Sequence, residues 1–204
     1  MCTNPLFTEQ LSKTLVSALD YIPTKYATTS EEVSDRDFII SFKNGNIFST
    51  IKAANMISNL LMNSYTRLDN VVLATVPASN STDNYERYYE FCDMICKHTG
   101  MLNGFKHITV YGDRAKKHFC KYHIPSRKLR NVILDSNWFN GKDVIIFDDI
   151  ITEGSSYALM ANAIEECGAN VWGGCFLGRT CRKKDLVGYK VLTKPTPQQL
   201  NIAF

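Results

Sequence analysis

Residues 144–156 read Val-Ile-Ile-Phe-Asp-Asp-Ile-Ile-Thr-Glu-Gly-Ser-Ser, and no other stretch says as much about the fold. The first four residues fit a buried parallel strand, because such strands show a continuous apolar run rather than alternation. Asp148 and Asp149 follow where this strand is expected to end. The turn 152–156 then leads into a helical pattern of apolar residues. The stretch therefore predicts a strand, two acids, a small hydroxyl-rich turn and a helix.

This geometry can hold a sugar phosphate. The helix N-terminus presents N–H groups and a partial positive charge to a phosphate. The hydroxyls of Thr152, Ser155 and Ser156 can donate hydrogen bonds, and Gly154 lets the backbone come close to the ligand. The two carboxylates precede the turn, where they can accept hydrogen bonds from ribose hydroxyls or face a hydrated Mg²⁺.

The stretch resembles the phosphoribosyl-pyrophosphate (PRPP) signature of type I phosphoribosyltransferases, in which a hydrophobic strand, two acids and two apolar residues precede Thr-Thr-Gly-x-Thr/Ser. The residues that match the signature are Asp148, Asp149, Thr152, Gly154 and Ser156. Glu153 departs from it, and a carboxylate at this position is expected to repel a bound phosphate. A generic nucleotide or Mg²⁺ site at the end of a parallel strand is the alternative interpretation.

Composition bounds the class of protein. The chain has 204 residues, of which 45% are apolar and 21% charged, so one domain with a full core is the simplest expectation. The net charge of +3 is too small to indicate nucleic-acid binding by itself. Seven scattered cysteines without a C-x-x-C pair indicate reduced thiols in a cytoplasm. No secretion signal and no apolar stretch of membrane-spanning length is visible.

The rest of the chain alternates between predicted helices and strands. We expect helices at 8–22, 47–65 and 85–98, strands at 38–42, 71–76, 107–111 and 171–177, and a solvated connection at 23–37. This order predicts an α/β fold with a doubly wound, mostly parallel sheet flanked by helices, and ligands in such sheets bind beyond the carboxyl ends of the strands. The rule gathers the loops 77–83, 112–130 and 148–156 at one rim.

We divide the chain into an N-terminal helical segment and linker (1–37), a phosphoribosyltransferase-like core (38–180) and a C-terminal extension (181–204). The extension is expected to contain an edge strand at 187–192 and a short terminal helix. Within the superfamily the layout is most similar to the competence-associated ComF-like group. The matching segments are 42–45, 76–77, 127–131 and 178–180. The N-terminal zinc ribbon that this group often carries has no counterpart here.

A PRPP site must also bind pyrophosphate. In the family, the loop after the strand at 71–76 commonly binds pyrophosphate through backbone N–H groups, which implies this role for Ser79, Asn80 and Ser81. A mobile basic loop commonly precedes the signature strand, and the segment 112–130 holds seven of the 23 lysines and arginines. The leading candidates for contact with pyrophosphate are Arg114, Lys117 and Arg130. A solvated basic loop without such contacts is the alternative.

Two hypotheses follow from the resemblance. The first is an enzyme that binds Mg²⁺-PRPP, places the 5′-phosphate on residues 152–156 and the ribose on Asp148 and Asp149, and transfers the phosphoribosyl group to a nitrogen nucleophile, with a nucleobase expected. The second is a PRPP-fold sensor, regulator or effector without transferase activity, which would have a protein or nucleic-acid partner; Glu153 motivates it. The acceptor stays open, as does the oligomeric state, although type I members are often homodimers.

Overall fold

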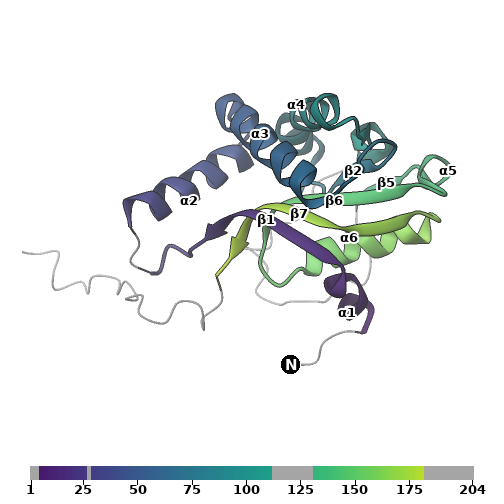
Figure 1. Cartoon of the computed structure of the whole chain (residues 1–204), viewed down its shortest axis with the longest axis horizontal. Helices are drawn as coiled ribbons and strands as arrows, with labels where there is room; N and C mark the ends of the chain where they lie inside the picture. The colour runs from purple at the N-terminus through teal and green to yellow at the C-terminus, as the bar shows by residue number, and fades with distance from the viewer. Residues whose placement is uncertain (1–4, 27–28, 112–130, 182–204) are drawn as a thin grey trace, which may run out of the picture.

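The computed structural model of the chain describes residues 5–26, 29–111 and 131–181. Within them, five parallel strands form a sheet in the order β1-β7-β6-β2-β3 (Figure 1). Their bounds are β1 Thr14–Tyr21, β2 Val72–Thr75, β3 Leu102–Asn103, β6 Asp143–Ile151 and β7 Asn170–Thr180. Two further strands, β4 (Ile108–Val110) and β5 (Val132–Leu134), form a separate antiparallel pair.

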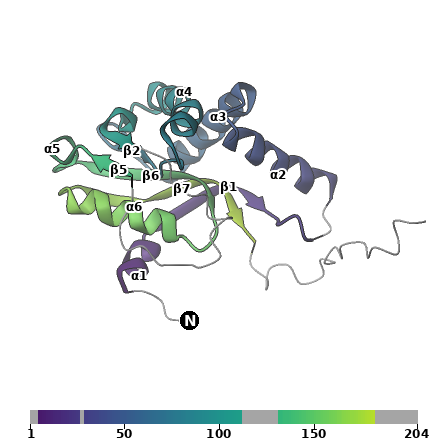
Figure 2. The same ribbon diagram turned by 180° about the vertical axis from the view of Figure 1, so that it is seen from behind.

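Helices cover both faces of the central sheet. The helices α2 (Ser30–Lys43), α3 (Ile47–Ser64) and α4 (Ser81–Thr99) lie on one face, and α1 (Pro5–Ser12) and α6 (Ser155–Glu166) lie on the other (Figures 1 and 2). Two short helices, η1 (Phe105–His107) and α5 (Ser136–Phe139), flank the β4–β5 pair. The predicted class, an α/β fold with a mostly parallel sheet flanked by helices, is confirmed.

Strand β6 supplies side chains to two separate cores. Ile145 and Phe147 point to the core formed with α2, α3 and α4, whereas Val144 and Ile146 point to the core formed with α6. All four side chains are fully buried. The alternation follows from the pleat of a strand, in which successive side chains point to opposite faces. An apolar run is required because both faces are covered.

Four aromatic rings fill the centre of the larger core. The ring of Phe147 lies 4.4 Å from that of Phe91 and 6.0 Å from that of Phe42, and Tyr88 lies 6.2 Å from Phe147. Tilted and edge-on aromatic pairs at such distances are favourable beyond the area that they bury. This cluster fixes α2 and α4 over β6, immediately before its two acids.

The segment 38–42 is helical, so the prediction of a strand there is wrong, as is the prediction that 23–37 is only a connection. Helix α2 begins with a capping box in which Thr29 and Glu32 bond each other's backbone N–H groups. Phe38, Ile39 and Phe42 are buried and Ile40 is exposed, which is a helical pattern. The expected domain boundary at residue 38 lies inside this helix.

The N-terminal helix is shorter than predicted. It ends at Ser12, and residues 14–21 form the edge strand β1, which pairs along its length with β7. The spacing of leucines fits a helix, but the pairing with β7 overrides it. Gly173 permits the close approach of the two strands, because a Cβ there would lie 2.0 Å from the carbonyl oxygen of Thr14.

Other predicted elements are confirmed with shifted bounds. Helices α3, α4 and α6 and strands β2 and β7 lie where the apolar patterns place them. The strand predicted at 107–111 exists as β4, but it pairs with β5 rather than with the central sheet. The predicted rim loop 112–130 follows β4 in the sequence. That segment, and the strand and helix expected after residue 181, lie outside the described residues.

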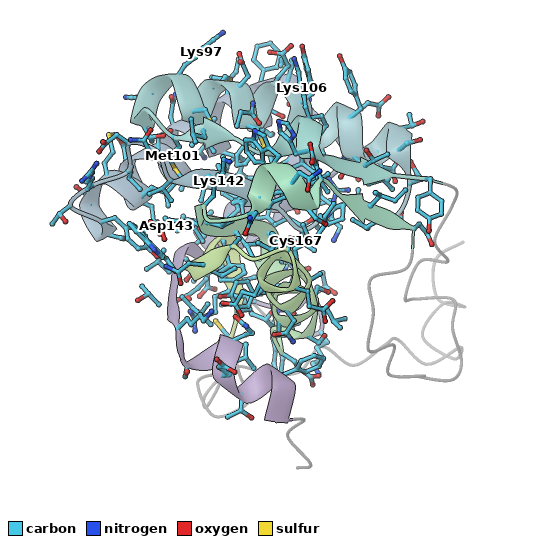
Figure 3. All side chains as sticks on the ribbon, turned by 90° about the vertical axis from the view of Figure 1, so that its right-hand side faces the viewer. Lys97, Met101, Lys106, Lys142, Asp143 and Cys167 are labelled. Atoms are coloured by element: carbon cyan, nitrogen blue, oxygen red, sulfur yellow. The ribbon has the colours of Figure 1, made fainter. Side chains whose placement is uncertain are left out.

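Polar contacts close the amino end of β6. Figure 3 looks at this end of the molecule, where Lys142 and Asp143 lead into the strand. The carboxylate of Asp143 accepts hydrogen bonds from the Asn170 amide at 2.7 Å and from the Trp172 indole at 2.8 Å. Each described helix is too short or too polar to cross a lipid bilayer.

Replacing Phe147 by alanine tests the aromatic cluster. We expect Phe147→Ala to lower the free energy of unfolding by about 3–5 kcal/mol, because three neighbouring rings lose their partner. The control is Ile133→Ala at a side chain that is 58% exposed, where a change within about 0.5 kcal/mol is expected. Urea denaturation of both variants measures the difference, and similar losses in the two would contradict the role of the cluster.

Candidate functional site

The two acids lie inside β6 and not beyond its end. The strand continues to Ile151, so Asp148 and Asp149 lie three and two residues before its end. Asp149 lies on the face of Phe147, toward α2 and α4. The backbone N–H of Asp149 donates to the carboxylate of Asp148 at 2.9 Å. The two adjacent acids therefore lie close to each other, and they differ in their ion pairs, because the two salt bridges of the described site both go to Asp149.

Asp149 is buried and paired with two cations. It is 5% exposed, and its Oδ2 accepts a hydrogen bond from Arg87 Nη1 at 3.1 Å and lies 3.4 Å from Lys43 Nζ. Arg87 comes from α4 and also donates from Nε to the carbonyl oxygen of Lys43 at 2.9 Å. The last residue of α2, the second turn of α4 and the end of β6 are thus joined by one charged cluster.

Asp148 has a different electrostatic environment. Burial raises the pKa of its carboxyl well above the ordinary range, and the negative charge of Asp149 raises it further. The opposing effects of the Asp149 N–H, Lys43 and Arg87 are smaller. Asp148 is therefore a carboxyl whose charged form gains stability from any cation or hydrogen-bond donor that binds beside it.

The turn after β6 leaves the start of α6 without a side-chain cap. Gly154 is the N-cap residue, with φ of +75°, and it has no side chain to cap the helix. The first intrahelical hydrogen bond runs from the Ala158 N–H to the Gly154 carbonyl oxygen at 2.9 Å. The partial positive charge of the helix therefore faces this turn. Among the turn residues, Thr152 shares a 2.8 Å hydrogen bond with the Thr180 hydroxyl, and Glu153 is exposed.

Gly154 is required for a second reason. A Cβ at this position would lie 2.4 Å from Cδ2 of Leu11. The N-terminal helix α1 is itself fixed to α6, since Gln10 donates to the Asn162 side chain at 2.9 Å and Lys13 pairs with Glu165. Helix α1 therefore packs against the turn through Leu11. The sequence does not predict this contact.

The loop after β2 shares the edge with this turn. Strands β2 and β6 pair directly and in parallel up to Thr75 and Phe147, so Ser79, Asn80 and Ser81 lie at the same carboxyl edge as residues 152–156. The side chain of Asn80 caps α4 by accepting from the Asp83 N–H at 2.8 Å.

The structure thus brings together Asp148, Asp149, the turn 152–156 and the loop 79–81. Arg114, Lys117 and Arg130, the predicted pyrophosphate contacts, lie outside the described residues. Lys43 and Arg87 were not foreseen as site residues. One feature of the sequence could have indicated Arg87, because this cation directly precedes Tyr88 on the buried face of α4. Lys43 reaches the site only because 38–43 is helical.

Of the comparisons with known proteins, the one with solved structures gives matches. No protein-family model matches the chain, and no curated protein matches it. Among solved structures it is similar to adenine phosphoribosyltransferase from Saccharomyces cerevisiae, at 19% identity over 74% of this chain and 76% of that one, with a TM-score of 0.38. It is also similar to adenine phosphoribosyltransferase from Leishmania tarentolae, at 13% identity over 74% of this chain and 89% of that one, with a TM-score of 0.41.

A phosphoribosyltransferase from Corynebacterium diphtheriae is similar at 15% identity, over 72% of this chain and 94% of that one, with a TM-score of 0.34. Identities and TM-scores this low say nothing about substrate or chemistry. The class of the fold rests on the strand order, and the site rests on its own residues.

A double-mutant cycle tests the support of the turn by α1. We expect Gly154→Ala to lower the free energy of unfolding by roughly 2–3 kcal/mol, from left-handed backbone strain and from contact with Leu11. In a Leu11→Ala background the same change should cost only about 1 kcal/mol, because the backbone strain alone remains. Urea denaturation measures both values. Equal costs in the two backgrounds would rule out the contact.

The raised pKa of Asp148 predicts a dependence of stability on pH. An acid with a higher pKa in the folded than in the unfolded chain binds a proton on folding, so its contribution to stability falls as pH rises above its ordinary value of 3.8. Asp148→Asn removes this loss. We therefore expect the variant to gain stability relative to the parent between pH 4 and pH 7, as measured by urea denaturation across that range.

Asp149→Asn provides the contrast at neutral pH. It leaves the buried guanidinium of Arg87 without its carboxylate, so a loss of about 3 kcal/mol is expected. If Asp148→Asn were as destabilising as Asp149→Asn at pH 7, the difference between the two environments would be refuted.

Proposed function

We propose that the chain is a phosphoribosyltransferase-like protein that binds Mg²⁺-PRPP and transfers the phosphoribosyl group to a nitrogen nucleophile, expected to be a nucleobase, with release of pyrophosphate. One observation carries the proposal. The start of α6, without a side-chain cap, lies directly after Asp148 and Asp149, at the edge of the sheet that also holds the loop 79–81. Anion-binding and hydroxyl-binding groups therefore share one edge.

The turn 152–156 suits the 5′-phosphate. The backbone N–H groups at the start of α6 and the helix dipole favour an anion, and Gly154 permits the left-handed backbone of the turn that leads into the helix. Hydroxyls of Thr152, Ser155 and Ser156 are the further donors in this role. Glu153 is exposed, so its side chain can turn toward solvent when a phosphate is present.

Asp148 suits the ribose. Ribose hydroxyls would donate to its carboxylate, and their binding would favour the charged form that burial disfavours. A transition state of oxocarbenium character then gains from this negative charge. The role of the acid pair is thus electrostatic and positional, with Asp148 the more available of the two.

Magnesium would bind together with PRPP and not as an ion held by the protein alone. In the described part of the chain, no group of three or more His, Cys, Asp or Glu side chains is placed to hold a metal ion. Asp149 is already paired with Lys43 and Arg87. These residues do not fit a resident Mg²⁺ held by the protein alone; the ion would be bound chiefly by the phosphates of PRPP and by water, as Mg²⁺ commonly is.

Pyrophosphate would leave toward the loop 79–81, where backbone N–H groups are the proposed donors. Arg114, Lys117 and Arg130 are proposed as additional cations from the basic segment 112–130. We also propose that the chain is most similar to the ComF-like group, because of its sequence motifs, and that it is located in the cytoplasm, because its cysteines are scattered.

A second candidate is a PRPP-fold sensor, regulator or effector that does not transfer the phosphoribosyl group. The observation that favours it is the burial of Asp149, which two cations already neutralise. A site with one available carboxylate can bind the ligand and yet stabilise the transition state poorly. The exposed Glu153 acts in the same direction.

Calorimetric titration of PRPP with Mg²⁺ tests both candidates. We expect binding in the micromolar range by the parent protein and a loss of at least about tenfold in Asp148→Asn, because a charge-assisted hydrogen bond is removed. The matched control is Asp69→Asn, at an exposed carboxylate that pairs with Arg67, and its affinity should equal that of the parent. No binding by the parent would overturn both candidates.

The same protein is then supplied with Mg²⁺-PRPP and a panel of nucleobases and small amines, and release of pyrophosphate is measured. Release that depends on one acceptor supports the transferase. Binding of PRPP without release for any acceptor supports the sensor.

A further inference from the structure

The end of α2 is fixed against the candidate site. Lys43 is the last residue of α2, and its carbonyl oxygen accepts from Arg87 Nε at 2.9 Å. The chain then turns at Gly45, whose φ is +75° and which packs closely against Glu86 of α4. Lys43 is therefore held at a defined position beside the first turns of α4, the helix that the loop 79–81 leads into.

The two cations on Asp149 differ in exposure. The side chain of Arg87 is 11% exposed, whereas that of Lys43 is 48% exposed. Both approach the same oxygen, Oδ2, and Lys43 does so at 3.4 Å, beyond the usual length of a charge-assisted hydrogen bond. Arg87 is therefore the internal partner of Asp149, and the ammonium of Lys43 keeps donors for another acceptor.

The charge of the cluster is also unbalanced. Two cations face one buried carboxylate, so the ion-paired groups Lys43, Arg87 and Asp149 together carry a net positive charge, and the neighbouring Asp148 also interacts with both cations. The more exposed of the two cations is Lys43, which lies beside Asp149 near the carboxyl end of β6. An anion that reached this end would meet a positioned and accessible ammonium group.

We infer that Lys43 binds the diphosphate group of the ligand, and that Asp149 positions Lys43 and Arg87 instead of contacting the ligand itself. The inference rests on the proposed function and deepens it. The diphosphate would lie on the α4 side of β6, the 5′-phosphate at the start of α6, and the ribose between them beside Asp148. A compact ammonium with three rotatable donors can keep one toward Asp149 while the others bind phosphate oxygens.

Titration with inorganic pyrophosphate and, separately, with Mg²⁺-PRPP tests this assignment in the parent and in three variants. Lys43→Gln should weaken the binding of pyrophosphate by roughly 10- to 100-fold, and Lys43→Arg should retain most of it. The matched control Lys52→Gln removes a lysine of α3 that lies over the Phe38 ring, and it should bind like the parent. The melting temperature of Lys43→Gln should stay within about 2 °C of the parent, because a half-exposed ion pair adds little stability.

The outcomes separate this inference from the proposed function. If Mg²⁺-PRPP binds equally well to the parent and to Lys43→Gln, the inference is overturned and the function stands. If pyrophosphate binding depends on Lys43 but PRPP does not bind, the inference stands and the function falls. Failure of the parent to bind either ligand overturns both.

Discussion

The rest of the structure depends on the pleat of β6. Both faces of this strand are covered by helices, so each apolar residue along it packs in one of two cores. Residues 144–147 satisfy this requirement with apolar side chains alone. At Asp148 and Asp149 the apolar run gives way to two neighbouring carboxyl groups, and Asp149 is the one that forms ion pairs with residues of α2 and α4.

The cluster around Asp149 shows how such a constraint is accommodated. A carboxylate carried under α4 by the pleat needs counter-charges, and Arg87 and Lys43 supply them. Asp148 forms no comparable ion pair in the described structure, and burial together with the charge of Asp149 raises the pKa of its carboxyl. Functional sites commonly retain such local destabilisation because a ligand can relieve it. Within one dipeptide, Asp149 is thus held by ion pairs, and Asp148 is the acid that we propose for ligand binding.

Much of the fold could be predicted from the sequence, because α3, α4, β2, β6, α6 and β7 have apolar patterns long enough to specify their type. The prediction of a strand at 38–42 is wrong because a short run with four apolar residues fits a strand as well as a buried helix face, and the capping box at Thr29 is the signal that distinguishes the two. Strand β1 was missed because an edge position is set by its partner, here by the close approach at Gly173.

The site also contains residues that the sequence predicts and residues that it does not. The turn 152–156 and the two acids are contiguous, so a short motif contains them. Lys43 and Arg87 are far from them in sequence, and only the packing of α2 and α4 over β6 brings them to Asp149. Contacts of this kind depend on tertiary structure, which local patterns do not encode.

The contact between Leu11 and Gly154 has a consequence for the history of this chain. A residue of the N-terminal helix fills the space that any side chain at position 154 would need. The two positions are therefore not free to drift independently. A lineage that enlarged residue 154 would first have to shrink residue 11 or detach α1, and one that lost α1 would relax the demand for glycine. Covariation between two positions far apart in the sequence is the trace that this packing should leave among descendants.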